Sequence, residues 1–561
     1  MLLLATAMVA LMWQPIHEES ATADEAWILG AGYTYCKGMG FRMHPDEPPL
    51  AKMWSALPLL FMPVKIPPES QSLFDGRTGY HLDRPWRGPF QESKLLFPSG
   101  RDSWYYWPWF EGDRFGQFFL YGGENDADRM LIAARFMQVV LAVLSAAAIF
   151  LWAKQLAGPI AGLFGCALWV FNPIALAHGH IVQTDGGGTL TVLLSVWSFT
   201  QFAQRPRLGG VVIAGLAFGL ALVTKLSALL LLPMFGAIAA LVWWKEPAGQ
   251  RTTLRFARLL PFFAVCAWVV IMVVYAPRWA PAPPLNERQA AWLNVPSWFE
   301  SLRPILIPPD FFKAVALLLG SADVGHSGYL FGQWSEAGWW YYYPVAFALK
   351  TPIPFLVLAV MALIFVSRQF RSRRAEELVP WIAAAMFFAL AMFNKMNIGV
   401  RHLLPVYGLL SVAVASQLAP HRGLWRVATA VLVIWLAAVS VLARPFYIEY
   451  FNEFAGGTRN GYKYLLDSNL DWGQDLKRLK NYLVDRHVDR CYLAFSGIEK
   501  AIAYYRINAT VVEAPDAQRL QQGTLVISAM LLMRPEWTWL REQRQPIDRV
   551  AYTLFVYKIG D

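Results

Sequence analysis

Charged residues are scarce in this chain: Asp, Glu, Lys and Arg together make up 16% of its 561 residues. Soluble globular proteins are nearer a quarter charged, so this composition excludes an ordinary soluble protein. Hydrophobic residues make up 56% of the chain, and the mean hydropathy is +0.35. Stretches of about twenty apolar residues recur, and each can cross a hydrocarbon core of roughly 30 Å. The sequence therefore predicts a polytopic α-helical membrane protein.

Cysteine is also rare, with four residues that are scattered and show no metal-ligand spacing. This excludes a disulfide framework and a zinc site of the usual kind. Internal repeats and low-complexity tracts are absent as well. A transporter built from inverted repeats therefore has no support from self-similarity of the sequence.

The apolar runs predict about eleven transmembrane helices. The first run lacks a preceding charge and an Ala-x-Ala site, so we interpret it as a first helix whose given start is too late, and not as a signal peptide. The predicted spans are 1–13, 129–152, 160–177, 190–202, 208–223, 226–244, 259–275, 345–366, 379–393, 403–418 and 428–442.

Lys and Arg account for a net charge of +10, and they gather in short loops between apolar runs. This pattern is typical of membrane orientation and not of a nucleic-acid-binding groove, so no nucleic-acid partner is expected. By the positive-inside rule, these loops lie in the cytoplasm. They are the loops at 205–207, 245–258, 368–374 and 422–426.

The remaining segments should share the opposite side of the membrane. They are the loops at 14–128 and 276–344, the links at 178–189 and 394–402, and the tail after 445. Chemistry in these segments would be extracytoplasmic. We therefore expect a multi-pass protein of the inner (cytoplasmic) membrane whose active site faces the periplasm or the exterior.

The tail differs in composition, because charged residues return and short strand-like runs appear between helix-like stretches. We predict a membrane domain at 1–446 and a small extracytoplasmic α/β domain at 447–561. Its predicted strands are 490–495, 524–529 and 550–558, and its predicted helices are 474–485 and 499–505.

Acidic and basic motifs follow the predicted helices on the outer side. Asp24 and Glu25 come just after the first span, and a Pro-Pro-Leu-Ala-Lys element ends at Lys52. This arrangement resembles the first loop of the GT-C superfamily of glycosyltransferases, in particular the protein O-mannosyltransferase and lipid A aminoarabinose transferase group. Further matching elements lie at 125–129 with Arg135, 172–173, 178–185, 224–227, 338–344, 350–352, 397–405 and 467–475.

The resemblance implies a GT-C-like fold and transfer of a sugar from a polyprenyl-phosphate carrier. It assigns Asp24 as the general base, with Glu25 and Asp185 orienting the acceptor or the base. One departure is notable: the family element usually has a His before Pro-Pro-Leu, where this chain has Glu47. We carry no role over to the nearby His44 for that reason.

The positions of basic residues on the predicted outer side give an independent argument for a phosphate-binding site. Lys225, Lys395 and Arg401 stand where the positive-inside rule disfavours them, and Lys350 lies inside an apolar run. A lipid phosphate would offset that cost, although snorkelling of the side chains to lipid headgroups is the alternative. The predicted phosphate-binding residues are Lys52, Lys225, Lys350, Arg401 and His402.

Polar and aromatic side chains in the matched elements are candidates for binding the substrate. Alternatives stay open: the aromatic cluster at 339–343 also fits a membrane-interface belt, and the 468–475 element also fits a helix cap at Gln474. The candidates are Arg135, Tyr342, Asn469, Asp471, Trp472 and Gln474.

His178 and His180 lie near Asp185, but a His-x-His pair at a helix end is more often interfacial than metal-binding. The resemblance also argues against a catalytic divalent metal. We expect no metal and no cofactor, the lipid-phosphate sugar being a substrate.

The leading hypothesis is an inverting glycosyltransferase that uses a polyprenyl-phosphate sugar and an acceptor hydroxyl on a protein, lipid or polysaccharide. A membrane transporter or lipid flippase is the alternative; it predicts paired broken helices and charges near the membrane midplane. A membrane-anchored sensor would leave the first loop unexplained. The sequence specifies neither sugar nor acceptor.

Overall fold

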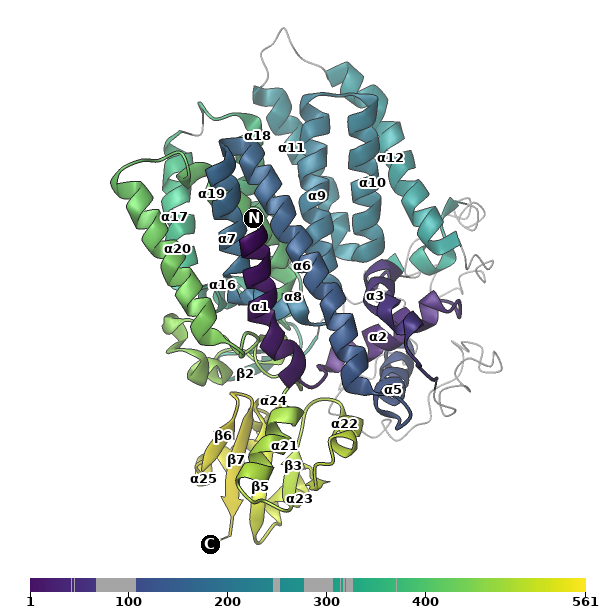
Figure 1. The fold of residues 1–561 in the computed structure, drawn as a ribbon, viewed down its shortest axis with the longest axis vertical. Helices are drawn as coiled ribbons and strands as arrows, with labels where there is room; N and C mark the ends of the chain where they lie inside the picture. The colour runs from purple at the N-terminus through teal and green to yellow at the C-terminus, as the bar shows by residue number, and fades with distance from the viewer. Residues whose placement is uncertain are drawn as a thin grey trace.

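The chain folds into a bundle of helices with a small domain at one end (Figure 1). The structure is a computed structural model. The structure describes residues 1–41, 43–44, 46–66, 107–245, 253–276, 306–312, 314–315, 318, 326–369 and 371–560. Most of the predicted loop at 276–344 lies outside these residues.

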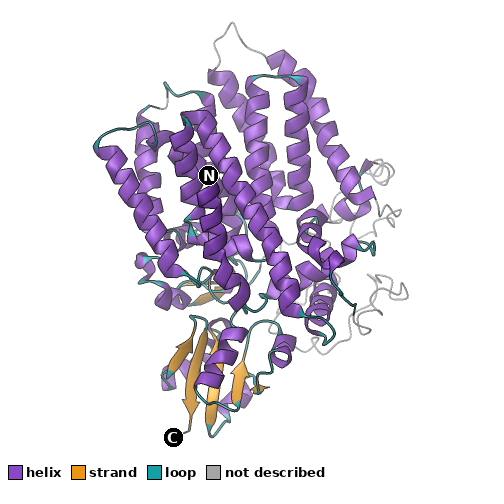
Figure 2. Cartoon of the chain, viewed as in Figure 1, coloured by secondary structure: helices purple, strands orange, loops and turns teal. Residues whose placement is uncertain are grey.

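Long apolar helices form the bundle, and Figure 2 shows that strands are concentrated in the small domain. The bundle helices pack with their small residues close together; Gly215 and Gly219 of α10, for example, lie against the backbone of α12. The helices are α1 (Leu2–Glu18), α6 (Ala127–Ala157), α7 (Pro159–Val170), α8 (Pro173–His180), α9 (Thr184–Gln204), α10 (Leu208–Thr224), α11 (Leu231–Lys245), α12 (Thr253–Tyr275), α16 (Tyr342–Lys350), α17 (Ile353–Arg368), α18 (Ala375–Met392), α19 (Leu404–Leu418) and α20 (Leu424–Ala443).

The predicted class, a helical membrane protein, is confirmed. Among the described residues, five helices are long and apolar enough to cross a membrane, or up to seven if each of two bent pairs is one span. The predicted number was about eleven. The numbers differ because several predicted spans form short helices, such as α10 with 17 residues and α19 with 15. A full crossing needs about 20 residues.

Two predicted spans are broken by proline. The chain bends by 66° between α7 and α8 and by 114° between α16 and α17. Pro173 and Pro352 stand at these breaks, where proline disfavours the helical conformation of the preceding residue. The prediction of one continuous span at 345–366 was therefore wrong. Lys350 lies at the end of α16 and not inside a crossing helix.

The basic links lie together at the end of the bundle away from the C-terminal domain (Figure 1). Lys245 Nζ donates to the carbonyl of Arg371 at 2.9 Å, and Gln204 Nε2 donates to Glu376 at 3.0 Å. These contacts join links that are far apart in the sequence. The loops that the positive-inside rule assigns to one side of the membrane therefore also lie at one end of the bundle.

The described parts of the first loop lie beside the other end of the bundle (Figure 1). Their elements are α2 (Ala23–Cys36), α3 (Pro49–Ala56), the 3-10 helix η1 (Leu57–Phe61) and α5 (Trp107–Tyr121), and α2 packs against both α3 and α5. Helix α2 begins with a capping box between Thr22 and Glu25. This cap places Asp24 in the first turn, at the edge of the bundle.

The C-terminal domain is built on a mixed five-stranded sheet in the order β4-β3-β5-β7-β6. Strands β4, β3 and β5 are parallel, and β7 pairs antiparallel with β5 and β6. Its elements are α21 (Leu476–Asp485), β3 (Cys491–Ala494), α22 (Glu499–Tyr504), β4 (Ala509–Val511), α23 (Ala514–Gln518), β5 (Gly523–Ser528), α24 (Ala529–Leu532), the 3-10 helix η10 (Pro535–Trp537), α25 (Thr538–Gln543), β6 (Asp548–Val550) and β7 (Leu554–Ile559).

The predicted small α/β domain is thus confirmed, with two differences in its strands, the first of which is that β4 was not predicted. The run predicted as a single strand at 550–558 contains the end of β6, a turn and most of β7. Ala551 has φ 50° at this turn, a left-handed conformation that ends the first strand.

Candidate active site

An ion pair joins the first loop to the link between α18 and α19. Arg401 lies in the 3-10 helix η6 (Val400–Leu403), and its Nη1 donates to Asp24 Oδ2 at 2.7 Å. The Arg401 side chain is 10% exposed and that of Asp24 is 22% exposed. The structure therefore brings the predicted base and a predicted phosphate-binding cation into direct contact, with an opening to solvent on the side of Asp24.

A second ion pair lies in the same region. Lys225, between α10 and the 3-10 helix η3 (Leu226–Leu230), donates to Asp185 Oδ1 at 2.5 Å. Burial alone would raise the pKa of Asp185, but the charges of Lys225 and Arg401 outweigh burial and hold that pKa below its ordinary value. Asp185 is therefore an anion in the site.

His402 stands next to these charges. Burial and the neighbouring charge of Lys225 lower the pKa of His402 to about 3, so its imidazole is neutral. A neutral ring can donate one hydrogen bond to a phosphate but adds no positive charge. The positive charge facing the two carboxylates comes from Lys225 and Arg401.

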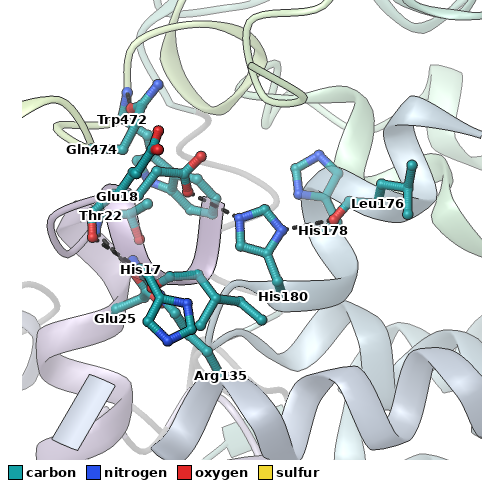
Figure 3. Close-up of polar contacts among 12 residues, drawn as sticks. His17, Glu18, Thr22, Glu25, Arg135, Leu176, His178, His180, Trp472 and Gln474 are labelled. Carbon is teal, nitrogen blue, oxygen red and sulfur yellow. Dashed lines mark hydrogen bonds and ion pairs between the residues drawn. The ribbon is translucent and has the colours of Figure 1, made fainter. Parts of the chain in front are cut away.

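Glu25 and Arg135 form a buried pair, and both side chains are 0% exposed. Arg135 lies against Glu25 (Figure 3) and donates to its Oε1 at 2.8 Å and its Oε2 at 2.6 Å. The other N–H groups of Arg135 donate to the carbonyls of Ile16, Glu19 and Ser20. Arginine has five N–H donors, and all five are used.

The two oxygens of Glu25 are equally occupied, because they also accept from the backbone N–H groups of Thr22 and Val182. Neither side chain has a free polar atom to orient or bind a substrate. We therefore replace the predicted roles of Glu25 and Arg135 with a structural one, which is to fix the start of α2 and so the position of Asp24.

Replacing Glu25 by Gln should lower the free energy of unfolding by about 1.5–3 kcal/mol, because an amide cannot satisfy four donors that surround a buried carboxylate. Denaturant unfolding of the purified protein measures this loss. Glu124→Gln is the control: Glu124 also pairs with a lysine, but its side chain is 46% exposed, and such pairs contribute about 1 kcal/mol or less. Equal losses in the two variants would contradict the structural role.

Two predicted phosphate-binding lysines are instead buried against the backbone. Lys52 donates to the carbonyls of His44 at 2.5 Å and Glu47 at 2.9 Å. Lys350 donates to the carbonyls of Ile448 at 2.7 Å and Asn469 at 2.6 Å. They are 0% and 1% exposed, so each ammonium is enclosed by the loop that it holds. We no longer assign a phosphate to either.

The predicted substrate-binding side chains of the 468–475 element are mostly held inside the protein. Asn469 Nδ2 donates to Tyr342 Oη at 2.9 Å, Asp471 accepts from the backbone of Met530 at 2.9 Å, and Gln474 donates to Glu449 at 3.0 Å. Gln474 does not cap a helix, because α21 begins at Leu476 and has no side-chain cap bond. These contacts connect the C-terminal domain to the bundle.

Trp472 is the member of this element that touches the ion pair. The guanidinium carbon of Arg401 lies 4.3 Å from the centroid of a Trp472 ring, a distance at which cation–π attraction is strong. The indole is 5% exposed, so this contact is shielded from water.

The two histidines near Asp185 do not gather around a common point. His180 contacts the carbonyl of Leu176 at 2.7 Å and Glu19 at 2.9 Å, whereas His178 lies beside Trp472 with ring centroids 6.4 Å apart (Figure 3). In the described part of the chain, no three Cys, His, Asp or Glu side chains are placed to hold a metal ion. The absence of a metal from the mechanism stays a prediction.

Sequence reasoning gave no role to Glu47, yet it lies at this site. Thr184 Oγ1 donates to Glu47 Oε1 at 3.2 Å, and the charges of Lys52, Lys225 and Asp185 all act on this carboxyl. Burial raises the pKa of Glu47 above its ordinary value. The sequence did contain a signal for Glu47, because this chain has an acid at the position where the family element has a histidine.

Asp113 of α5 was also missed. Burial raises the pKa of Asp113 to about 6, and the charge of Asp24 adds to the shift. The carboxyl is therefore close enough to Asp24 for their charges to interact. No motif pointed to it, because it lies far along the first loop.

Part of the chain is similar in sequence to a known protein family. Residues 127–278, which span α6 to α12, match the model of the family described as dolichyl-phosphate-mannose-protein mannosyltransferase. This match confirms the resemblance that the sequence motifs indicate. The chain is thus a helical membrane protein, and one segment of it matches the model of this family.

A curated relative is the undecaprenyl phosphate-alpha-4-amino-4-deoxy-L-arabinose arabinosyl transferase 1 of Pseudomonas fluorescens, which is 27% identical over 278 residues. The alignment covers 49% of this chain and 42% of that protein, less than half of each.

Two solved structures are similar at lower identity. One is ArnT from Cupriavidus metallidurans bound to undecaprenyl phosphate, with 12% identity, a TM-score of 0.45, and coverage of 99% of this chain and 97% of that chain. The other is the oligosaccharyltransferase AglB from Archaeoglobus fulgidus with an inhibitory peptide and a dolichol-phosphate, with 11% identity, a TM-score of 0.47, and coverage of 98% and 74%.

Proposed function

We propose that this protein is a membrane glycosyltransferase that moves a sugar from a polyprenyl-phosphate carrier to an acceptor hydroxyl. The observation that carries the proposal is the pairing of Asp24 with Arg401 and of Asp185 with Lys225 in one polar region. The site thus holds two carboxylates and two cations close together. A transferase of this kind needs a base for the acceptor and positive charge for the leaving phosphate.

The reaction follows from the positions of these groups. Asp24, the more exposed of the two carboxylates, takes the proton of the acceptor hydroxyl. The acceptor oxygen bonds to the anomeric carbon as the bond from that carbon to the phosphate oxygen breaks. The electron pair leaves with the carrier phosphate, and Arg401 and Lys225 stabilise its charge. A single displacement of this kind inverts the anomeric configuration.

The two ion pairs also explain how the protein can hold these charges before the donor binds. Each cation neutralises one carboxylate, which offsets the desolvation cost of both groups. Arg401 Nε is buried and has no hydrogen-bond partner among the described residues, so this side chain keeps a free donor. A lipid phosphate can therefore bind Arg401 without first breaking every existing contact.

The family similarities support the donor class. The matched family is described by dolichyl-phosphate-mannose, and the relative from Pseudomonas fluorescens is named for an undecaprenyl-phosphate sugar. Both descriptions combine a sugar with a polyprenyl monophosphate. The sugar and the acceptor of this chain are not specified by these names.

The side of the membrane follows from the distribution of charge. The basic links lie at the far end of the bundle, whereas α2, which carries Asp24, and the C-terminal domain lie at the other end (Figure 1). By the positive-inside rule, the site faces the periplasm or exterior of the cytoplasmic membrane. Charges grouped at one end also favour an interfacial enzyme over a transporter or lipid flippase, whose ion sites lie near the midplane.

Comparison of cells with and without the gene tests the proposal. Mass spectrometry of their glycans and lipids should show one glycoside that disappears with the gene and returns when the gene is restored. The sugar-loaded polyprenyl phosphate should accumulate in the deleted cells, because its consumption stops. Identical glycans and lipid intermediates in the two strains would contradict the proposed function.

A further inference from the structure

One short segment between the bundle and the C-terminal domain contacts both members of the Asp24–Arg401 pair. This segment, residues 468–474, contains Trp472 and is called the bridging segment below. Its contacts fall into three groups: contacts to η6, contacts to the start of α2, and contacts to the C-terminal domain.

The contacts to η6 hold both the backbone and the side chain of Arg401. Ser468 Oγ donates to the carbonyl of Ile398 at 2.9 Å, and the Val400 N–H donates to Asn469 Oδ1 at 2.9 Å. The guanidinium of Arg401 then lies 4.3 Å from the Trp472 ring. The bridging segment therefore positions both the backbone at Arg401 and its guanidinium group.

The contacts to α2 hold Asp24. The N–H of Ala23, the residue before Asp24, donates to the Trp472 carbonyl at 3.0 Å, and the Ser20 N–H donates to the Gln474 carbonyl at 2.8 Å. The Trp472 carbonyl thus accepts a hydrogen bond from the backbone beside Asp24, and the Trp472 ring contacts the guanidinium of Arg401. Trp472 therefore contacts both sides of the ion pair.

The bridging segment is in turn held by the C-terminal domain. The Met530 N–H at α24 donates to Asp471 Oδ2 at 2.9 Å, and within the segment the Trp472 N–H donates to Gln474 Oε1 at 2.8 Å. Asp471 is 3% exposed, and Gln474 is 0% exposed. The domain outside the bundle therefore acts on the site through Trp472.

We propose that Trp472 is a positioning residue for Arg401, and the proposal rests on the proposed function of Arg401 in binding the carrier phosphate. An aromatic ring engages the face of a guanidinium and leaves its in-plane N–H groups free. One such group already donates to Asp24, and the buried Nε is free of protein partners in the described structure. The ring holds the plane of Arg401 so that the free edge meets the lipid phosphate.

Binding of undecaprenyl phosphate to the purified full-length protein tests this role. Trp472→Leu should weaken binding roughly fivefold to thirtyfold, because a shielded cation–π contact is lost. Trp472→Phe, which keeps a weaker aromatic face, should fall between Leu and wild type. The matched control is Trp537→Leu, which removes another buried indole of the C-terminal domain, 4% exposed, and should leave the affinity unchanged.

A double-mutant cycle separates positioning of Arg401 from a general effect on the fold. In an Arg401→Lys background, Trp472→Leu should have less than about a twofold effect on affinity, because lysine has no planar group for the ring to orient. The same loss in both backgrounds, or no loss in wild type, would overturn the positioning role.

The proposed function fails in a distinguishable way. If Arg401→Lys and Arg401→Ala bind undecaprenyl phosphate as wild type does, Arg401 is not a phosphate ligand, whatever Trp472 does. If Arg401→Ala weakens binding and Trp472→Leu does not, the phosphate site stands and only the role of Trp472 is wrong.

Discussion

Asp24→Asn is expected to lower the rate of sugar transfer by at least about a hundredfold, because a general base of this kind contributes roughly 10²–10⁴ in rate. The amide has nearly the size of the carboxylate but cannot accept a proton from the acceptor hydroxyl. The side chain lies at the first turn of α2, is partly exposed, and contacts Arg401 at 2.7 Å. The substitution should therefore leave the fold and membrane insertion intact.

The measurement is turnover of a radiolabelled polyprenyl-phosphate sugar by purified variants. Asp185→Asn should lie between Asp24→Asn and wild type, because Lys225 already occupies Asp185. Asp485→Asn, an exposed carboxylate on α21, is the control and should behave as wild type. If Asp24→Asn keeps more than about a tenth of the activity, Asp24 is not the base, and Asp185 becomes the better candidate.

Arg401→Ala should lower kcat/KM for the lipid donor by about 10²–10³, the loss that typically follows removal of one group that stabilises developing negative charge. Binding of the donor itself should weaken by about 1.5–3 kcal/mol, the range for a charge-assisted hydrogen bond. Arg401→Lys should restore only part of both effects, because an ammonium cannot offer the planar fork of the guanidinium.

Arg459→Ala provides the control for the arginine. Arg459 is exposed in the tail that follows the bundle, so its removal changes the net charge of the protein by the same amount without touching the site. Its kcat/KM should stay near the wild-type value. Equal losses for Arg401→Ala and Arg459→Ala would assign the effect to general electrostatic attraction and would contradict a specific phosphate contact.

Local patterns in the sequence predicted the elements that depend on neighbouring residues. Short strand-like runs predicted β3 and β5, and apolar runs predicted the helices of the bundle. The breaks between helices within one apolar run were harder to predict. The run around Pro352 is apolar on both sides, and hydropathy alone could not show that the chain turns by 114° there.

The site was predicted as a set of residues but not as a set of pairs. Motif matching selected Asp24 and Arg401 separately, and nothing local to either position indicated that they are in contact across 377 residues. The pairing arises from the packing of the first loop against η6 and the bridging segment. Long-range geometry of this kind is not encoded in spacing along the chain.

Buried polar groups explain the residues whose roles changed. Lys350 stood out because a charge in an apolar context requires compensation. A lipid phosphate was one source of compensation, but backbone carbonyls provide it within the protein. The sequence correctly indicated that burying a charge has a free-energy cost. Only the structure shows which groups offset that cost.

Transfer by the purified wild-type protein tests the central claim most directly. The protein, in lipid nanodiscs, is incubated with a polyprenyl-phosphate sugar radiolabelled in the sugar and with the membrane lipids, proteins and polysaccharides of its own cells as acceptors. Protein-dependent movement of label into one acceptor class, with release of an equal amount of carrier monophosphate, is the predicted result. No protein-dependent consumption of any lipid-monophosphate sugar, or turnover only of a sugar nucleotide, would contradict it.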